Sequence, residues 1–249
     1  MKTVLITGCS SGFGLETARH FLARGWQVVA TMRTPRNDVL PPSDRLRVLA
    51  LDVTDAESIR KCVAAAGAID VLVNNAGFGV ASPAELTPLS TVREVFETNT
   101  FGTIAMTQAM VPQFRQRGAG VVVNVTSSVT LKVLPLIAAY RASKMAVNAF
   151  TESMALELAP FGVRACLVLP GRSPETRFGD NARPHMHGFD HVAYADLVKN
   201  VVARMTDTSS PTTHAPDVAE AVWRAATDPS SPLRIAAGAD AEAWMAEAR

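Results

Sequence analysis

A tyrosine and a lysine four residues apart, Tyr140 and Lys144, lie in a stretch of helical composition from Ala138 to Ala159. Four residues of an α-helix rise ~6 Å and return to nearly the same side, so the lysine ammonium can lie beside the phenol. An ammonium at ~4 Å supplies about the ~4 kcal/mol that brings a phenol pKa from ~10 to ~7. The pair could therefore exchange protons at neutral pH. The alternative is an exposed pair on an alanine-rich helix.

Composition sets the class of protein. The chain has 249 residues, 48% of them apolar, and a net charge of +1. It can bury a large core and offers no global attraction to nucleic acid or to an anionic membrane. No apolar run approaches ~20 residues, and the first apolar stretch is too short for a signal peptide. Three cysteines without metal spacing indicate reduced thiols. We expect a soluble, cytoplasmic protein of one domain.

Short apolar runs alternate with helix-like segments along the whole chain. Runs without polar alternation are typical of strands covered on both faces, and the alternation with helices predicts one parallel, doubly wound sheet in an α/β fold. The expected strands contain Val4–Ile6, Val28–Ala30, Val48–Leu51, Val71–Val73, Val121–Val123, Cys166–Leu169 and Leu233–Ala236. The expected helices follow Gly14 and span Ala56–Ala66, Ser90–Arg117, Ala138–Ala159, His191–Met205 and Pro216–Thr227.

A glycine-rich turn with the spacing T-G-x-x-x-G-x-G follows the first expected strand and precedes the first helix. Its glycines are Gly8, Gly12 and Gly14. Glycines at such a turn let the backbone approach a pyrophosphate, whose charge is met by free N–H groups at the helix N-terminus. The alternative is a tight connection that needs positive φ. The turn therefore indicates a dinucleotide site only together with other motifs.

Further motifs follow in a fixed order, and together they resemble the short-chain dehydrogenase/reductase family over most of the chain. They are the glycine turn, Asp52-Val53, Asn74-Asn75-Ala76-Gly77, Asn99, Ser127, Tyr140, Lys144 and Pro170-Gly171. Ser127 lies 13 positions before Tyr140, a spacing common in that family. Parts of the chain are similar to its hydroxysteroid and retinol dehydrogenase branches. The resemblance implies a Rossmann-type single domain over residues 1–249, with helices on both faces of the sheet and a homodimer or homotetramer.

The resemblance also implies roles for four catalytic residues. Tyr140 would exchange a proton with the substrate oxygen during hydride transfer, and Ser127 would hydrogen-bond that oxygen. Lys144 would hold the nicotinamide ribose and lower the phenol pKa, and Asn99 would anchor a proton-relaying water. Ser127 could instead be a turn hydroxyl beside Ser128. Asn99 could instead satisfy a helix kink.

The second expected strand ends in Thr31-Met32-Arg33, where users of NAD usually place a carboxylate. A basic residue there suits the 2′-phosphate of NADP, so NADP(H) is favoured and NAD(H) is the alternative. Arg33 and Arg36 could also be a solvated loop edge. The complete set of expected cofactor-binding residues is Gly8, Ser10, Ser11, Gly12, Phe13, Gly14, Arg33, Asp52, Val53, Asn75, Ala76, Gly77, Tyr140, Lys144, Pro170, Gly171 and Thr176.

The chain departs from the family after Pro170-Gly171. Arg172 stands where an aliphatic residue is usual, and Thr176 comes one residue late. The segment of about residues 172–214 is expected to cover the substrate, and from Arg177 to His214 to act as a mobile lid; a fixed helical excursion is the alternative. Its histidines, His185, His187 and His191, are expected to be exposed loop residues, with no metal site.

Two other classes of function compete with this interpretation. A catalytically silent dinucleotide sensor could lose the hydroxyl and amine groups, yet all four catalytic residues are present. A nucleotide-sugar epimerase or dehydratase would show a different glycine spacing and a longer chain. The sequence therefore predicts an NADP(H)-dependent oxidoreductase acting on a carbonyl or secondary alcohol, with an apolar small-molecule substrate and neither nucleic acid nor membrane as a partner.

Overall fold

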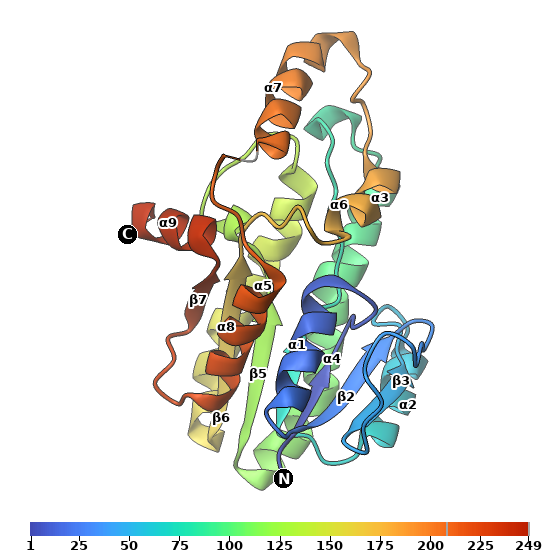
Figure 1. Ribbon diagram of the computed structural model, residues 1–249, viewed down its shortest axis with the longest axis vertical. Coiled ribbons are helices and arrows are strands. Elements are labelled where there is room, and N and C mark those ends of the chain that lie inside the picture. The colour runs from blue at the N-terminus through green and yellow to red at the C-terminus, as the bar shows by residue number, and fades with distance from the viewer. Residues whose placement is uncertain (208, 249) are drawn as a thin grey trace.

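The computed structural model describes residues 1–207 and 209–248 and contains a parallel β-sheet with helices on both faces (Figure 1). The sheet has seven strands in the order β3-β2-β1-β4-β5-β6-β7. The chain winds outward from β1 in one direction and from β4 in the other, as a doubly wound sheet requires. The strands are β1 (Thr3–Ile6), β2 (Gln27–Met32), β3 (Leu46–Ala50), β4 (Val71–Asn74), β5 (Gly120–Val125), β6 (Val163–Pro170) and β7 (Arg234–Ala237).

The expected helical stretches are all present, with two differences in their local form. The stretch beginning at Ser90 is α3, a π-helical turn at Glu97–Phe101 and then α4, and α7 follows a 3₁₀ turn at Val192–Tyr194. The helices are α1 (Gly12–Ala23), α2 (Ala56–Ala66), α3 (Leu89–Phe96), α4 (Gly102–Arg117), α5 (Ala138–Leu158), α6 (Phe178–Ala182), α7 (Ala195–Thr206), α8 (Ala215–Thr227) and α9 (Ala239–Glu247).

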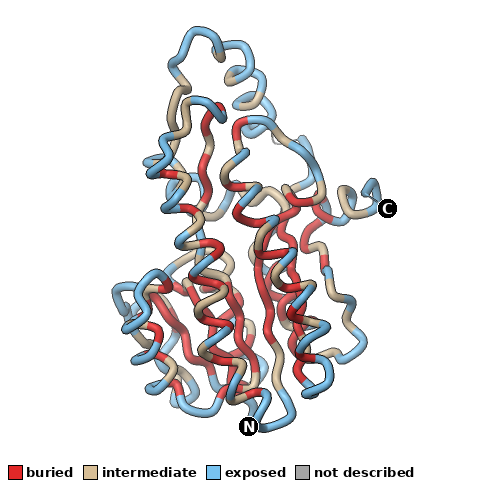
Figure 2. Tube along the Cα trace, turned by 180° about the vertical axis from the view of Figure 1, so that it is seen from behind, coloured by how far each residue is buried: buried red, intermediate tan, exposed pale blue. Residues whose placement is uncertain are grey.

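Two apolar layers hold the helices to the sheet. α1 and α8 pack on one face, where Val4 and Ile6 point, and α2, α4 and α5 pack on the other, where Leu5 points. Because successive side chains of a strand face opposite sides, the uninterrupted apolar run of β1 supplies both layers. Figure 2 shows the central strands buried along their length.

The expectation that all strands are covered on both faces is wrong for β3. Its residues are half-buried or exposed, with Arg47 and Ala50 exposed. β3 is an edge strand that pairs with β2, and within the described residues no strand lies on its other side.

The carboxyl ends of the parallel strands meet at one edge of the sheet, and the order of strands reverses between β1 and β4 at that edge. Ligands of open α/β sheets bind there. The chain between β6 and α8 extends beyond this edge, and α7 forms its far end in Figure 1. None of the described helices is long and apolar enough to span a lipid bilayer.

Candidate active site

The glycine turn connects β1 to α1 and is braced by Asn75. Gly8 and Gly12 have φ values of 75° and 59°, which favour glycine. The amide nitrogen of Asn75 donates to the carbonyl oxygens of Thr7 (2.9 Å) and Gly8 (3.2 Å). A Cβ on Gly14 would collide with this amide and with the Gly8 carbonyl. Gly14 therefore allows the close packing of helix, turn and the residues after β4.

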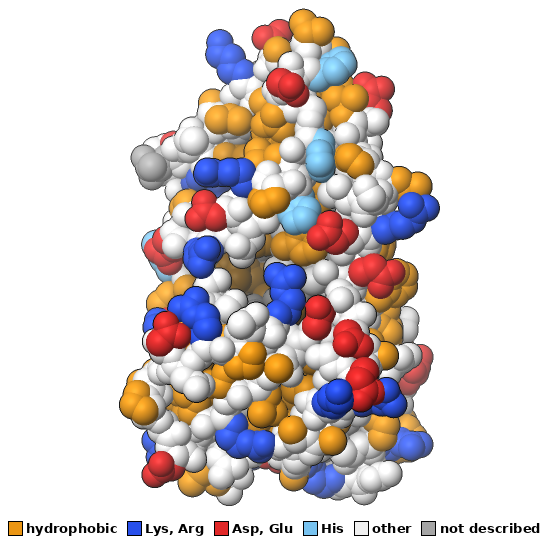
Figure 3. Space-filling model, turned by 90° about the vertical axis from the view of Figure 1, so that its right-hand side faces the viewer, with side chains coloured by type: hydrophobic (Ala, Val, Ile, Leu, Met, Phe, Trp, Pro, Cys, Tyr) orange, Lys and Arg blue, Asp and Glu red, His pale blue; other side chains and the backbone are white. Residues whose placement is uncertain are grey.

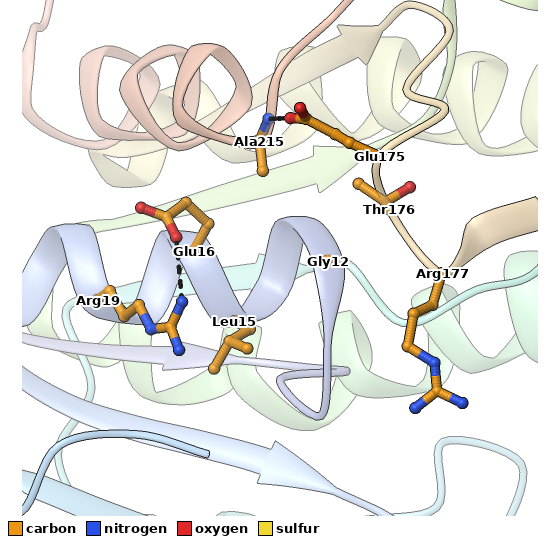
Figure 4. Close-up of a pocket in the computed structure, with 8 residues that line it drawn as sticks. All are labelled: Gly12, Leu15, Glu16, Arg19, Glu175, Thr176, Arg177 and Ala215. Atoms are coloured by element: carbon orange, nitrogen blue, oxygen red, sulfur yellow. Dashed lines mark hydrogen bonds and ion pairs between the residues drawn. The ribbon is translucent and has the colours of Figure 1, made fainter.

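The N-terminus of α1 is chemically suited to a pyrophosphate. The side chain of its N-cap residue, Ser11, makes no capping hydrogen bond, and the first turn carries no acidic residue. A Cβ on Gly12 would meet nothing closer than Thr176, at 3.7 Å. Gly12, Thr176 and Arg177 line one cleft of about 380 Å³ (Figure 4). Free N–H groups, an open approach and a nearby guanidinium fit a dinucleotide.

Cys9 fills the inside of the turn. Its thiol is fully buried and donates to the carbonyl oxygen of Ile6 at 3.3 Å. Burial raises the pKa of Cys9 to about 12, so the thiol stays protonated at neutral pH. The position suits a small packing residue and not a redox group.

Arg33 and Asp52 lie near each other beyond the carboxyl ends of β2 and β3. Hydrogen bonds from Thr54 lower the pKa of Asp52, and the charge of Arg33 acts in the same direction. Arg36 instead pairs with Asp38 at 3.1 Å. Among the described residues Arg33 forms no ion pair, so it is the arginine available to a phosphate at this end of the site.

Tyr140, Lys144 and Ser127 lie together at the carboxyl end of β5. Their exposed fractions are 7%, 6% and 8%. The ammonium of Lys144 donates to the carbonyl oxygen of Val125 at 3.1 Å, and the Ser127 hydroxyl lies close enough to the Tyr140 phenol to affect its pKa. One turn of α5 thus presents both the phenol and the ammonium to the end of the strand.

Burial dominates the protonation of this pair. It raises the pKa of Tyr140 to about 12, which the hydrogen bond with Ser127 partly opposes, and it lowers the pKa of Lys144 to about 8. The expected lowering of the phenol pKa by Lys144 is therefore wrong for these residues as the structure has them. The reason is that the ammonium is held by the Val125 carbonyl in a site that disfavours charge.

Asn99 lies fully buried in the π-helical turn between α3 and α4. Its side-chain oxygen accepts from the backbone nitrogen of Phe78 at 3.0 Å, and its amide donates to the Phe78 carbonyl at 3.0 Å and to the Ser143 hydroxyl at 3.1 Å. The side chain of Asn99 thus bonds to the chain after β4 and to α5, and not to its own irregular helix, and it lies near Lys144.

Gly77 marks where Asn99 and Lys144 come together. A Cβ there would lie 2.8 Å from the side-chain oxygen of Asn99 and 3.3 Å from the lysine nitrogen. The backbone after β4 passes between them without a side chain. The last glycine of the Asn-Asn-Ala-Gly motif is thus required by close approach, since its φ is not positive.

The Ser127 hydroxyl caps a turn and lies beside the phenol. Its oxygen accepts from the Val129 nitrogen at 3.3 Å and so caps the 3₁₀ turn Ser128–Thr130. The same hydroxyl opposes the rise in the pKa of Tyr140 that burial causes. Ser128 is almost fully buried, at 1% exposure, and is not among the groups that shift the pKa of the Tyr140 phenol.

The loop after β6 is fixed by Asp240 of α9. A Cβ on Gly171 would collide with the Asp240 carboxylate, which accepts from the Arg172 nitrogen at 2.6 Å and from the Thr213 hydroxyl at 2.7 Å. The Arg172 guanidinium donates to the carbonyl oxygens of Met205 (2.6 Å) and Asp207 (2.7 Å). The residue that replaces the usual aliphatic side chain thus holds the two ends of the 172–214 segment together.

Thr176 lies over Gly12, and its hydroxyl donates to the Ser173 carbonyl at 2.9 Å. The neighbouring Glu175 accepts from the Ala215 nitrogen at the start of α8 and pairs with His214 at 3.1 Å. Figure 4 shows Glu175 and Arg177 extending from Thr176 in different directions. The one-residue shift therefore brings Thr176 to the glycine turn with its hydroxyl bonded inside the loop.

Two of the histidines are not exposed loop residues, contrary to expectation. The ring of His185 packs on that of Phe78 with centroids 4.4 Å apart, and His187 bonds to the Thr91 hydroxyl at 3.2 Å. Both are half-buried, whereas His191 is exposed. They contact the chain between β4 and α3 because this part of the covering segment folds back onto it. Figure 3 shows histidines among hydrophobic side chains on the upper part of one face, above a hollow.

Several residues of the site were not identified from the sequence. The Thr7 hydroxyl accepts from the backbone nitrogens of Asn75 and Ala76, both at 2.9 Å, and the Val125 carbonyl holds Lys144. Thr7 opens the glycine motif and could have been found there. A backbone carbonyl leaves no signal in a sequence.

The comparisons with known proteins agree with this fold. The family model described as short chain dehydrogenase matches residues 2–186. The chain is 34% identical over 238 residues to the uncharacterized oxidoreductase YusZ of Bacillus subtilis, covering 91% of this chain and 85% of that protein. The chain belongs to the short-chain dehydrogenase family.

A second relative is human retinol dehydrogenase 8, which is 39% identical over 181 residues. That match covers 68% of this chain and 58% of the relative, so the chain spans little more than half of that protein's length. The relative belongs to one of the branches that the sequence resembles.

Solved structures show the same architecture. A short-chain dehydrogenase from Streptomyces avermitilis has a TM-score of 0.85 and 33% identity, over 99% of this chain and 91% of that one. A short-chain dehydrogenase from Burkholderia cenocepacia in complex with NADP has a TM-score of 0.78 and 26% identity, over 99% of this chain and 94% of that one. The 3-ketoacyl-(acyl-carrier-protein) reductase from Brucella melitensis, complexed with NADH, has a TM-score of 0.77 and 26% identity. The match covers 94% of this chain and 96% of that one. The fold is that of NAD(P)-dependent oxidoreductases.

Proposed function

We propose that the chain is an NADP(H)-dependent oxidoreductase that interconverts a carbonyl compound and a secondary alcohol, with Tyr140 as general acid and base. The observation that carries this proposal is the meeting of Ser127, Tyr140, Lys144 and Asn99 at the carboxyl ends of β4 and β5, beside the glycine turn. Such an edge is where α/β sheets hold their ligands.

Each of the four residues has a separate role in the proposed reaction. When bound, the nicotinamide supplies or accepts the hydride. Tyr140 gives its proton to the substrate oxygen in reduction and takes it back in oxidation, and Ser127 hydrogen-bonds that oxygen as its charge changes. Lys144 would hold the nicotinamide ribose, and Asn99 would anchor a water that relays protons to Lys144.

The proposed NADP(H) preference rests on Arg33, the arginine without an ion pair at the end of β2. Gly8 to Gly14 would receive the pyrophosphate, and Asp52 and Val53 would flank the adenine. The NADP-bound relative from Burkholderia supports this choice. The NADH-bound relative from Brucella keeps NAD(H) as the second candidate.

We assign the substrate to the apolar class. Tyr140 packs in a cluster with Val80 and Val95, and the partly buried residues around it are also apolar: Phe78, Phe96, Val129, Ile137 and Ala139. Charged groups would lose hydration in such surroundings without gaining partners. Segment 172–214 would cover this side of the site.

We also propose a cytoplasmic homodimer or homotetramer. The free, buried thiols of Cys9, Cys62 and Cys166 suit a reducing compartment. Phe101 of the π-helical turn and Met145 and Leu156 of α5 are exposed, which suits contact between copies through the long helices. Light scattering of the purified chain tests this part: a monomer at micromolar concentration would contradict it.

A screen of ketones, aldehydes and secondary alcohols with NADPH, NADH and their oxidised forms tests the function. Turnover is followed by the nicotinamide absorbance. We expect reduction of apolar ketones, with NADPH preferred. Binding of NADPH without turnover of any carbonyl or alcohol would instead support a dinucleotide sensor.

A further inference from the structure

Phe178, the first residue of α6, lies against the catalytic phenol. The ring centroids of Phe178 and Tyr140 are 5.7 Å apart, and the planes meet at 60° in an edge-to-face arrangement. Such pairs are attractive beyond their buried area. The Phe178 side chain is 40% exposed, so one side of the ring faces Tyr140 and another remains open. A residue 38 positions from Tyr140 in the sequence thus forms a wall beside the reacting group.

The ring of Phe178 packs against the backbone of Gly79. A Cβ on Gly79 would lie 2.7 Å from Cζ and 2.8 Å from Cε1 of Phe178, and 3.5 Å from the Cβ of Ala182. The φ of Gly79 is not positive, so the backbone conformation does not require glycine there. What requires glycine there is the space that the phenyl ring of Phe178 occupies. Gly79 and Phe178 are therefore matched in shape across two distant parts of the chain.

The next residues hold α6 in place. Met186 forms a parallel β-bridge with Ala81, and the His187 nitrogen donates to the Ala81 carbonyl at 3.3 Å. The His185 ring packs on Phe78. α6 and the residues that follow it therefore pack along the chain from residue 78 to residue 81. Phe178 lies between this chain and Tyr140, next to the apolar cluster of Val80 and Val95.

We propose that Phe178, seated on Gly79, is a specificity-determining residue: it limits the size of the apolar substituent that a carbonyl substrate places between Tyr140 and α6. The inference rests on the proposed function and extends it to a choice among substrates. A carbonyl compound held by Tyr140 must direct one substituent past the Phe178 ring. Removing the ring opens that side and leaves the proton donor unchanged.

The first experiment compares wild type with Phe178→Ala on methyl ketones of increasing alkyl length, with NADPH. We expect the ratio of kcat/KM for a bulky ketone to that for a small one to rise by about tenfold or more, the scale of discrimination by a hydrophobic pocket. Phe161→Ala is the matched control, because Phe161 has similar exposure (45%) and lies beyond the other end of α5. Its ratio should equal that of wild type.

The second experiment is a double-mutant cycle with Gly79→Ala. In the wild-type background the added methyl meets the Phe178 ring and should lower the melting temperature by about 2 to 4 °C. In the Phe178→Ala background the same methyl has room, and the shift should disappear. This readout needs no activity.

The two experiments separate the possible failures. If wild type reduces ketones but Phe178→Ala keeps the wild-type size ratio, the specificity role is overturned while the proposed function stands. If Gly79→Ala has the same effect on melting in both backgrounds, the shape match is overturned. If wild type turns over no carbonyl compound, the proposed function fails and the inference fails with it.

Discussion

The ammonium of Lys144 donates a hydrogen bond to the carbonyl oxygen of Val125 at 3.1 Å, which ties α5 to the end of β5. Ser127 follows two residues later, and Tyr140 lies one helical turn before the lysine. This contact, together with the hydrogen bond from the Asn124 amide to the Thr151 hydroxyl at 2.8 Å, ties the strand to the helix that carries the phenol. The charge of this buried lysine is also the feature of the site most sensitive to pH.

The pH dependence of ketone reduction should follow Lys144. Burial lowers its pKa to about 8, whereas burial raises the pKa of Tyr140 to about 12, so the phenol keeps its proton when the lysine loses its charge. We expect kcat/KM for reduction to be constant below about pH 8 and to fall above it. Oxidation, which needs the phenolate, should gain rate as pH rises. A reduction profile that stays flat to pH 10 would show that the lysine charge is not required.

Asn99→Ala should destabilise the chain as well as slow turnover. The substitution leaves the backbone nitrogen and carbonyl of the half-buried Phe78 without their partners. Each such group costs ~1–3 kcal/mol, so we expect a loss of roughly 2–4 kcal/mol in the free energy of unfolding. Asn148→Ala is the control, because Asn148 is also buried and its side-chain oxygen makes no hydrogen bond. If urea unfolding shows that Asn99→Ala and Asn148→Ala lose equal free energy of unfolding, the bonds of Asn99 to Phe78 do not have the stabilising role assigned to them.

Cofactor preference should reverse in the double variant Met32→Asp with Arg33→Ala. The new carboxylate repels a 2′-phosphate and accepts ribose hydroxyls, and the guanidinium near Asp52 is removed. The measurement is kcat/KM with NADPH and with NADH for wild type and variant. Arg36→Ala is the control, since Arg36 already pairs with Asp38. Equal efficiency of wild type with both cofactors would show that Arg33 does not read the phosphate.

The covering segment should open and close with ligand. Arg177 and Arg183 are exposed, whereas the residues from His185 to Gly188 contact the chain before α3. We expect trypsin to cut the free protein after Arg177, since Arg183 precedes Pro184 and is not a trypsin site, and NADPH with a substrate analogue to slow that cut. Cleavage after Arg60 in α2 serves as the internal control. Equal resistance with and without ligands would identify the segment as fixed architecture.

The fold could be predicted because its signals are local. Each buried strand is a run such as Val71–Val73, and each long helix carries apolar residues at helical spacing, so every expected strand and helix is found. α6 and α9 were missed because they are short and set by distant contacts: Phe178 on Tyr140, and Asp240 on Arg172 and Thr213.

The site could be predicted as a set of residues but not as an arrangement. Spacing relates Tyr140 to Lys144, yet nothing in it indicates that a backbone carbonyl takes the ammonium or that burial raises the phenol pKa. Likewise His185 and His187 read as loop residues, because their partners Phe78 and Thr91 are about 100 positions away. Long-range packing decides both cases.

The most direct test of the central claim is the turnover of Tyr140→Phe on an apolar ketone with NADPH, measured beside cofactor binding by fluorescence titration. The substitution removes only the phenolic oxygen from a buried ring. We predict that the variant folds and binds NADPH as wild type does, and that kcat falls by at least ~10²-fold, the scale of general acid catalysis. A variant that retains most of the wild-type kcat would contradict the assignment of Tyr140 as the proton donor.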